Sequence, residues 1–223
     1  VKDGELVGLI GPNGAGKTTL IDAISGFVNA AGTVALGDRD LRGLPAYERA
    51  RHGLTRTWQS TELFDDLSVS ENLTVAARES GASEEDAKRT LALVGMEWAA
   101  AAEPSALSSG QRKLVGVARA LVAGPKLLCL DEPAAGLDSG ESEELGATLR
   151  RLADQGQSML LIEHDMGLVL GICDRVVVLE FGKVIAEGTP EDVRRDPKVI
   201  AAYLGDGMES AGAGGPSEEA ESV

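Results

Sequence analysis

Residues 11–18 read GPNGAGKT and fit the pattern G-x-x-x-x-G-K-[ST], which strongly restricts what this chain can fold into. The apolar segment Leu6–Ile10 in front of it predicts a buried strand. Behind it, Thr19–Ser25 predicts a helix that stops at Gly26. A strand, a glycine-rich turn and a helix in this order form a phosphate-binding loop within an α/β fold.

The residue types within this loop suit the binding of a nucleotide. Glycine lets backbone N–H groups approach a phosphate without obstruction by a Cβ, and the helix N-terminus adds about half a positive charge. Lys17 can reach the β- and γ-phosphates of ATP, and the Thr18 hydroxyl can ligate Mg²⁺. An ordinary glycine turn before a helix is the alternative. The predicted nucleotide contacts are Gly11, Asn13, Gly14, Ala15, Gly16, Lys17, Thr18 and Thr19.

The charge of the chain argues against nucleic acid as a partner. Its 223 residues include 21 basic and 36 acidic side chains, which gives a net charge of −15 at pH 7. Five acidic and no basic residues lie in 205–223, so residues 1–204 carry −15 + 5 = −10. Such a charge repels the phosphates of nucleic acid and of anionic lipid. Residues 205–223 are rich in Gly, Ala, Ser and Glu and are predicted to form a disordered acidic tail.

Hydrophobic content predicts a globular protein that does not insert into a membrane. The hydrophobic fraction is 43% and the aromatic fraction 3%, so we expect a core of Leu, Val, Ile and Ala. No apolar run reaches about 18 residues, and no signal peptide is apparent. The two cysteines, Cys129 and Cys173, lack metal-ligand spacing and are predicted to be packed thiols in a reducing compartment.

Predicted strands and helices alternate along the chain, which indicates a mostly parallel sheet covered by helices. We expect a helical insertion near residues 65–110 and a hairpin around Phe181–Lys183. The further predicted strands are Thr33–Leu36, Leu54–Trp58, Leu127–Leu130, Met159–Ile162, Val176–Glu180 and Val184–Glu187. The further predicted helices are Tyr47–His52, most of 67–94, an amphipathic helix that includes 114–121, and Glu143–Ala153.

Two acidic residues, Asp131 and Glu132, end the predicted strand Leu127–Leu130. The carboxyl end of that strand lies at the sheet edge that also carries the phosphate loop. There Asp131 can hold Mg²⁺, and Glu132 can polarise an attacking water as a general base. A solvated Asp-Glu turn is the alternative, which the phosphate loop in the same chain disfavours.

A second anion site is predicted at Leu107-Ser108-Ser109-Gly110-Gln111, which opens the amphipathic helix. A hydroxyl and backbone N–H groups at a helix N-terminus favour an anion. Because the chain already has one phosphate loop, this site is most simply explained if it serves the nucleotide of a second subunit. An N-cap serine without a ligand is the alternative.

Together these motifs resemble the nucleotide-binding domain of ABC ATPases, an α/β domain of the P-loop NTPase class. Residues 107–111 are similar to the LSGGQ signature of that family, with Ser109 where glycine is usual. The resemblance implies that Gln59 senses Mg²⁺ and water, that the D-loop with Asp138 bridges two subunits, and that His164 contacts the γ-phosphate. It implies Ser108, Ser109, Gly110 and Gln111 as nucleotide contacts, and Thr18, Gln59 and Asp131 at the metal.

Further motifs are similar to the ATPase subunit of branched-chain amino acid uptake transporters. The resemblance covers about residues 1–204 and implies an ATP-binding core of 1–64 and 111–204 with a helical signature subdomain of 65–110. It implies a second ATPase subunit and membrane permease subunits as partners, at the cytoplasmic face of the membrane. The motifs are 24–27, 56–59, 134–137, 163–166, 187–190 and 201–205.

Three other functions remain as alternatives, and one feature departs from the family. The alternatives are a lipopolysaccharide-export type ATPase, a non-transport ABC ATPase and a P-loop kinase. Family members carry about 25–30 residues upstream, near the size of one βαβ unit, with an aromatic residue that stacks on adenine. No aromatic residue precedes Phe27 here, so we expect truncation or fusion and a weakened nucleotide affinity.

Overall fold

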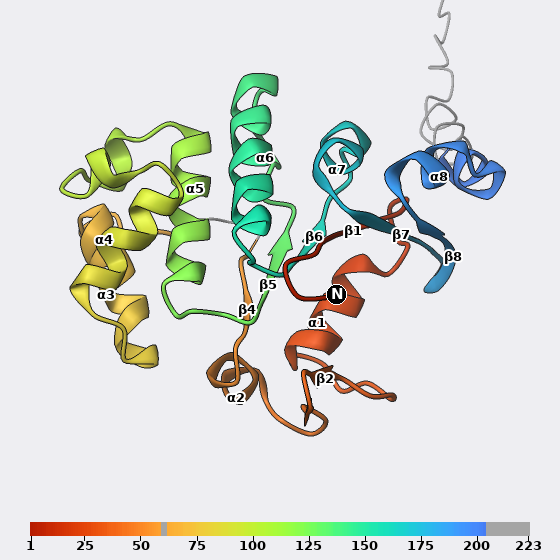
Figure 1. Cartoon of the computed structure of the whole chain (residues 1–223), viewed down its shortest axis with the longest axis horizontal. Helices are drawn as coiled ribbons and strands as arrows, with labels where there is room; N and C mark the ends of the chain where they lie inside the picture. The colour runs from red at the N-terminus through yellow and green to blue at the C-terminus, as the bar shows by residue number, and fades with distance from the viewer. Residues whose placement is uncertain (59–61, 204–223) are drawn as a thin grey trace, which may run out of the picture.

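The centre of the fold is a β-sheet with the strand order β4-β5-β6-β1-β7-β8 (Figure 1). The structure, a computed structural model, describes residues 1–58 and 62–203. Neighbouring strands from β4 to β7 run parallel, and β8 pairs antiparallel with β7, which confirms the predicted mostly parallel sheet and hairpin. The strands are β1 (Leu6–Ile10), β4 (Leu54–Arg56), β5 (Leu127–Asp131), β6 (Met159–Ile162), β7 (Arg175–Glu180) and β8 (Lys183–Gly188).

Helices cover both faces of the sheet, with α5, α6 and α7 on one side and α1 on the other (Figure 1). Among the described residues, no helix is both long and apolar enough to cross a membrane. The α-helices are α1 (Lys17–Ser25), α2 (Ala46–Arg51), α3 (Val69–Ser80), α4 (Glu84–Leu93), α5 (Ser109–Leu121), α6 (Ser139–Asp154), α7 (Met166–Ile172) and α8 (Pro190–Arg195). The short 3₁₀ helices are η1 (Glu97–Ala99) and η2 (Pro104–Ala106).

Side chains alternate along the central strands and enter two separate cores. In β1, Leu6 and Ile10 belong to a larger core with the helices α3 to α8. Val7 and Leu9 point to the opposite face, into a smaller core with Ile21 of α1. All five residues of β1 are buried, as expected for a parallel strand that is covered on both faces.

Both cysteines are buried free thiols, as predicted. Cys129 lies in the smaller core and Cys173 in the larger one. Burial raises the pKa of each thiol to about 12, because the thiolate would lose its hydration. Neither side chain is therefore a nucleophile at neutral pH.

The helical segment between β4 and β5 consists of α3, α4, η1, η2 and α5, which pack against one another. Three of its helices begin with a capping box, at Ser68, Ser83 and Ser108. Gly81 ends α3 in a left-handed conformation, with φ of 76°, and divides the predicted helical stretch 67–94 into two helices.

Two predicted strands are shorter than expected. The segment 33–36 contributes only β2 (Ala35–Leu36), which pairs with β3 (Arg39–Asp40) in a separate two-stranded ribbon around Gly37. The strand expected to reach Trp58 ends at Arg56, because the chain leaves β5 after Thr57 and turns Trp58 outward. The ribbon is local and adds nothing to the main sheet.

Candidate nucleotide-binding site

Three of the predicted site segments follow adjacent strands at one edge of the sheet. The strand register places Asp131 beside Ile162, and Ile162 beside Leu9. The Glu132 N–H donates to the Ile162 carbonyl at 2.9 Å, which extends this alignment past the strand ends. The phosphate loop follows β1 and His164 follows β6, so both leave the sheet at the same carboxyl edge as the two acidic residues.

The phosphate loop packs against the turn between β7 and β8. The Gly182 N–H donates to the carbonyl of Ala15 at 2.8 Å. A Cβ at Gly11 would lie 2.1 Å from the Leu179 carbonyl oxygen of β7, so the first position of the loop tolerates no side chain. The glycine that the pattern requires is thus fixed by close approach of a neighbouring strand.

The N-terminus of α1 faces this loop without a side-chain cap. Its N-cap is Gly16, with φ of 98°. The Lys17 ammonium curls back over the loop and donates to the carbonyls of Gly11 at 2.6 Å and Pro12 at 3.2 Å, and the residue is 8% exposed. A buried cation and first-turn N–H groups therefore lie together. The exposed residues of this segment are Asn13, Gly14, Thr18 and Thr19.

Asp131 forms an ion pair with an arginine to which the sequence motifs assigned no role. Arg56, at the end of β4, places Nη2 2.6 Å from Oδ2 of Asp131. The same guanidinium pairs through Nη1 with Asp22 of α1. Arg56 thus connects the helix that follows the phosphate loop with the strand that ends in the acidic pair.

Glu132 has a left-handed backbone, with φ of 45°. For a residue with a Cβ this conformation costs roughly 1–2 kcal/mol. Two backbone hydrogen bonds hold it: the Glu132 N–H donates to Ile162, and its carbonyl accepts from Ala135 at 3.1 Å. Strain of this kind at a sheet edge is typical of active sites.

A buried carboxylate, Glu163, ties the loop after Glu132 to His164. Its side chain is fully buried. It accepts the N–H of Ala134 at 2.8 Å on one oxygen and the N–H of His164 at 3.3 Å on the other. Burial raises the pKa of Glu163, and the hydrogen bond from Ala134 opposes this shift. The His164 side chain is 61% exposed, so it faces outward from this edge.

The signature segment forms a second anion-binding arrangement, which a carboxylate of the same chain uses. The hydroxyl of Ser108 and the N–H of Gly110 both donate to Oε1 of Glu141, at 2.8 and 3.0 Å. Both hydrogen bonds lower the pKa of Glu141, and the bond from Gly110 has the larger effect. Gln111 completes the capping box with Ser108, and Asp138 caps α6 by accepting the N–H of Glu141 at 2.8 Å.

The donors at the sheet edge fit a triphosphate with Mg²⁺. The buried ammonium of Lys17 and the uncapped N-terminus of α1 suit an anion. The Thr18 hydroxyl and the Asp131 carboxylate are the hard oxygen donors that Mg²⁺ prefers. Within residues 1–58 and 62–203, no group of three or more His, Cys, Asp or Glu side chains could hold a metal ion.

The structure describes where most of the predicted site residues lie. Gln59 lies outside the described residues. Arg56, Glu163 and Glu141 were not predicted, although each contacts a predicted site residue. Arg56 lies in the motif 56–59 with Gln59, and Glu163 lies in the motif 163–166 with His164. This proximity in the sequence was the only signal that could have pointed to them. Glu141 follows the D-loop by three positions and carries no such signal.

Comparison with known families and proteins agrees with this geometry. The sequence model of the family described as "ABC transporter" matches residues 1–135. A second family, described as "Branched-chain amino acid ATP-binding cassette transporter", matches residues 183–209.

Individual relatives are similar over nearly the whole chain. The high-affinity branched-chain amino acid transport ATP-binding protein LivG of Salmonella typhimurium is 40% identical, covering 92% of this chain and 89% of LivG. The lipopolysaccharide export system ATP-binding protein LptB of Escherichia coli is 36% identical, covering 92% and 88%. The crystal structure of the ADP conformation of MJ1267, an ATP-binding cassette of an ABC transporter, superposes with a TM-score of 0.82 at 32% identity, covering 92% and 89%.

Proposed function

This chain belongs to the ABC transporter ATP-binding family, and from that premise we propose that it is the ATP-hydrolysing subunit of a branched-chain amino acid importer. The similarity to LivG and the match of residues 183–209 support this choice of transported solute. Lipopolysaccharide export is the second candidate, supported by the lower identity to LptB.

One observation carries the ATPase assignment: the phosphate loop and the pair Asp131–Glu132 meet at one edge of the sheet. Lys17 and the N–H groups of α1 bind the β- and γ-phosphates, with Asn13 and Thr19 beside them. Thr18 and Asp131 would hold Mg²⁺, which would neutralise charge on the phosphates. The described site thus binds and orients the reactant while the protein supplies little covalent chemistry.

Glu132 acts on the attacking water. Its half-buried carboxylate accepts a proton from that water, and its strained backbone fixes where the carboxylate lies. His164 donates a hydrogen bond to the γ-phosphate, and Glu163 holds the histidine backbone in place. Gln59 completes the set as a sensor of Mg²⁺ and water.

A second ATPase subunit, identical or paralogous, completes each site. The signature segment is tied to α6 through Glu141, whereas the phosphate loop packs against the β7–β8 turn. In the dimer that we propose, Ser108, Ser109, Gly110 and Gln111 of one subunit face the ATP of the other. Asp138 lies at the same end of α6 and approaches the second subunit there.

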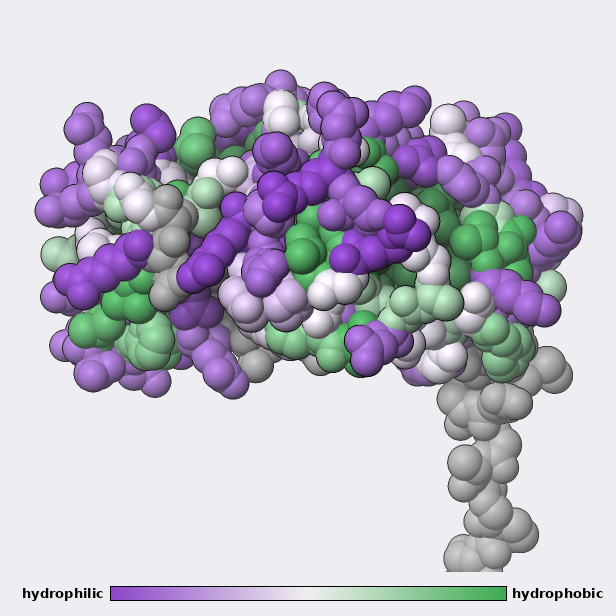
Figure 2. Space-filling view, turned by 90° about the horizontal axis from the view of Figure 1, so that it is seen from below, coloured by the Kyte–Doolittle hydropathy of each residue, from purple (hydrophilic) through white to green (hydrophobic). Residues whose placement is uncertain are grey.

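A permease subunit docks on the face that carries α1 and α2. Phe27, Tyr47 and Trp58 are exposed there and line an apolar groove of about 590 Å³. Figure 2 shows hydrophobic surface among hydrophilic side chains on this side of the molecule. Docking of this kind places the chain at the cytoplasmic face of the membrane. In this proposal the chain consists of an ATP-binding core of 1–64 and 111–204 and a helical subdomain of 65–110.

The replacement Glu132→Gln tests the catalytic assignment. It keeps the shape of the side chain but removes the base, so hydrolysis should fall by about 10²–10⁴-fold while ATP binding persists. We expect the variant to accumulate as an ATP-bound dimer, measured by size-exclusion chromatography with ATP present. Hydrolysis at the parent rate would exclude Glu132 as the base.

Uptake of labelled leucine into vesicles that contain the permease subunits would decide which solute is transported.

A further inference from the structure

The guanidinium of Arg56 connects the buried carboxylate of Asp131 with two exposed aromatic rings. Its side chain is 6% exposed and lies between two carboxylates. Nη2 is 2.6 Å from Oδ2 of Asp131, and Nη1 pairs with Asp22 of α1. A buried guanidinium with two acidic partners is held firmly, because moving it away from them would leave its charge uncompensated.

The same guanidinium also contacts exposed aromatic rings. Its Cζ atom lies 4.6 Å from the centroid of the Trp58 ring and 6.0 Å from that of Phe27. The two rings meet edge to face, with centroids 5.0 Å apart. Trp58 and Phe27 are 51% and 52% exposed, so a partner can touch them directly. Arg56 is the link between this aromatic pair and a buried carboxylate.

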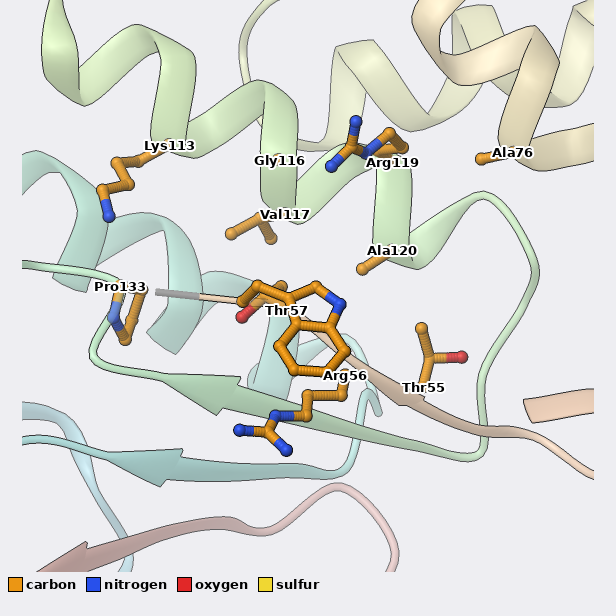
Figure 3. Close-up of a pocket in the computed structure, with 11 residues that line it drawn as sticks. Thr55, Arg56, Thr57, Ala76, Lys113, Gly116, Val117, Arg119, Ala120 and Pro133 are labelled. Atoms are coloured by element: carbon orange, nitrogen blue, oxygen red, sulfur yellow. The ribbon is translucent and has the colours of Figure 1, made fainter. Parts of the chain in front are cut away.

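A second cavity, of about 220 Å³, opens on the other side of this segment (Figure 3). Thr55, Arg56 and Thr57 come from β4 and its continuation, and Lys113 and Val117 come from α5. The segment that carries Arg56 therefore has open space beside it. A small displacement of Trp58 is not blocked by a packed core on this side.

Arg56 also determines how Asp131 presents its carboxylate. Because Oδ2 of Asp131 is bonded to Arg56, the geometry of the ion pair fixes the direction in which the other oxygen points. Groups that orient a metal ligand in this way usually affect the metal affinity strongly.

We propose that Arg56 is a positioning residue that orients Asp131 for Mg²⁺ and couples this carboxylate to the Trp58–Phe27 pair. A contact that shifts the aromatic pair shifts the guanidinium and with it the carboxylate. Conversely, Mg²⁺ at Asp131 changes the surroundings of the Trp58 ring. This inference rests on the proposed function, and it assigns Arg56 no direct contact with the nucleotide.

Trp58 provides a direct reporter of this coupling. The sequence has two tryptophans, and the other, Trp98, lies exposed in η1, so Trp98→Phe leaves a single probe. The test adds Mg²⁺ to this protein in the presence of a non-hydrolysable ATP analogue and follows the Trp58 emission. In parallel, the Mg²⁺ concentration for half-maximal ATP hydrolysis is measured.

We expect the parent emission to change on adding Mg²⁺ and the change to be lost in Arg56→Met. The Mg²⁺ requirement of that variant should rise by about tenfold to a hundredfold. Arg51→Met is the matched control, because Arg51 stacks on the exposed Tyr47 ring at 5.6 Å on the same face. It should behave like the parent in both measurements.

Arg56→Lys keeps the inference testable if Arg56→Met does not fold by circular dichroism. Lysine retains a positive charge between the carboxylates but cannot present a planar group to both and to the indole. It should also weaken the emission change and raise the Mg²⁺ requirement. An unchanged Mg²⁺ requirement or a full emission change in a folded Arg56 variant would overturn the inference, as would a parent that hydrolyses ATP without any Mg²⁺-dependent emission change. A parent that neither binds nor hydrolyses ATP would instead overturn the proposed function on which the inference rests.

Discussion

The strained backbone of Glu132 predicts that two inactive variants differ in stability in a defined direction. Its φ of 45° costs roughly 1–2 kcal/mol for any residue with a Cβ, alanine included. Glycine avoids this cost but gains about 0.5–1 kcal/mol of freedom in the unfolded chain. Glu132→Gly should therefore be more stable than Glu132→Ala by about 0.5–1 kcal/mol, or about 1–4 °C in Tm. Both variants lack the carboxylate, so neither should hydrolyse ATP.

Urea denaturation and thermal unfolding of the two variants measure this difference directly. A matched pair at Glu144, exposed within α6, provides the control. There glycine should be less stable than alanine by about 1 kcal/mol, because the position is helical. If alanine were more stable than glycine at position 132 by the same margin as at position 144, the backbone would carry no strain, and the reasoning would be wrong. ATP hydrolysis at the parent rate by either variant would contradict the assignment of Glu132 as the base.

Three further predictions concern the loop, the signature segment and acid stability. Gly11→Ala should destabilise the fold by about 1–3 kcal/mol and abolish binding of a fluorescent ATP analogue, since its Cβ would lie 2.1 Å from a carbonyl oxygen of β7. The control is Gly171→Ala in the helix α7, where a Cβ meets nothing within 4 Å; this variant should lose no stability, and equal losses would refute the clash. Glu141→Ala should lower the ATP concentration needed for dimerisation of the Glu132→Gln protein, because Glu141 occupies two hydrogen-bond donors of the signature segment that the ATP of the other subunit would otherwise use. Glu144→Ala is the charge-matched control. Identical titrations of the two variants would exclude competition between Glu141 and ATP. Arg175 of β7, whose Nε lies 2.8 Å from Oε1 of Glu5, lowers the pKa of Glu5 from 4.5 to about 2. The Glu5 carboxylate therefore stabilises the fold above pH 4.5 and loses this contribution as the pH falls towards 2. Glu5→Gln should flatten the pH dependence of the free energy of urea unfolding over that range, and an unchanged slope would contradict this expectation.

The strand, phosphate loop and helix were predictable because their signals are local. Leu6–Ile10 forms the predicted strand without change of bounds, and Gly26 ends α1 as expected. The alternation of apolar segments was enough to predict a mostly parallel sheet, because each buried strand is aliphatic along its whole length. The helix start was placed two residues late, since it begins at Lys17 within the glycine-rich pattern itself.

The contacts that connect the site were not predictable from the sequence. Arg56 meets partners 34 and 75 positions away, and Glu141 meets Gly110 across 31 positions. No periodicity or motif specifies such pairs, because they depend on how separate elements pack. The left-handed backbone of Glu132 is equally hidden, since glutamate has no preference for that conformation. The predicted strand at 33–36 forms only at Ala35–Leu36, and its pairing in a separate ribbon was not predictable because its apolar residues suit a local ribbon as well as a sheet.

The carboxylates at the sheet edge have different environments, and the environments separate what they can do. Asp131 is bonded to a buried arginine, which orients its carboxylate as a metal ligand requires. Glu163 is fully buried, has a raised pKa and accepts two backbone N–H groups, so it organises the loops on either side. In Glu132 the fixed part is the backbone, and the residue is only half-buried, so it is more open to water than the buried Asp131 and Glu163. Among these three, Glu132 alone combines a fixed origin with access to water, which is why the base assignment falls on it.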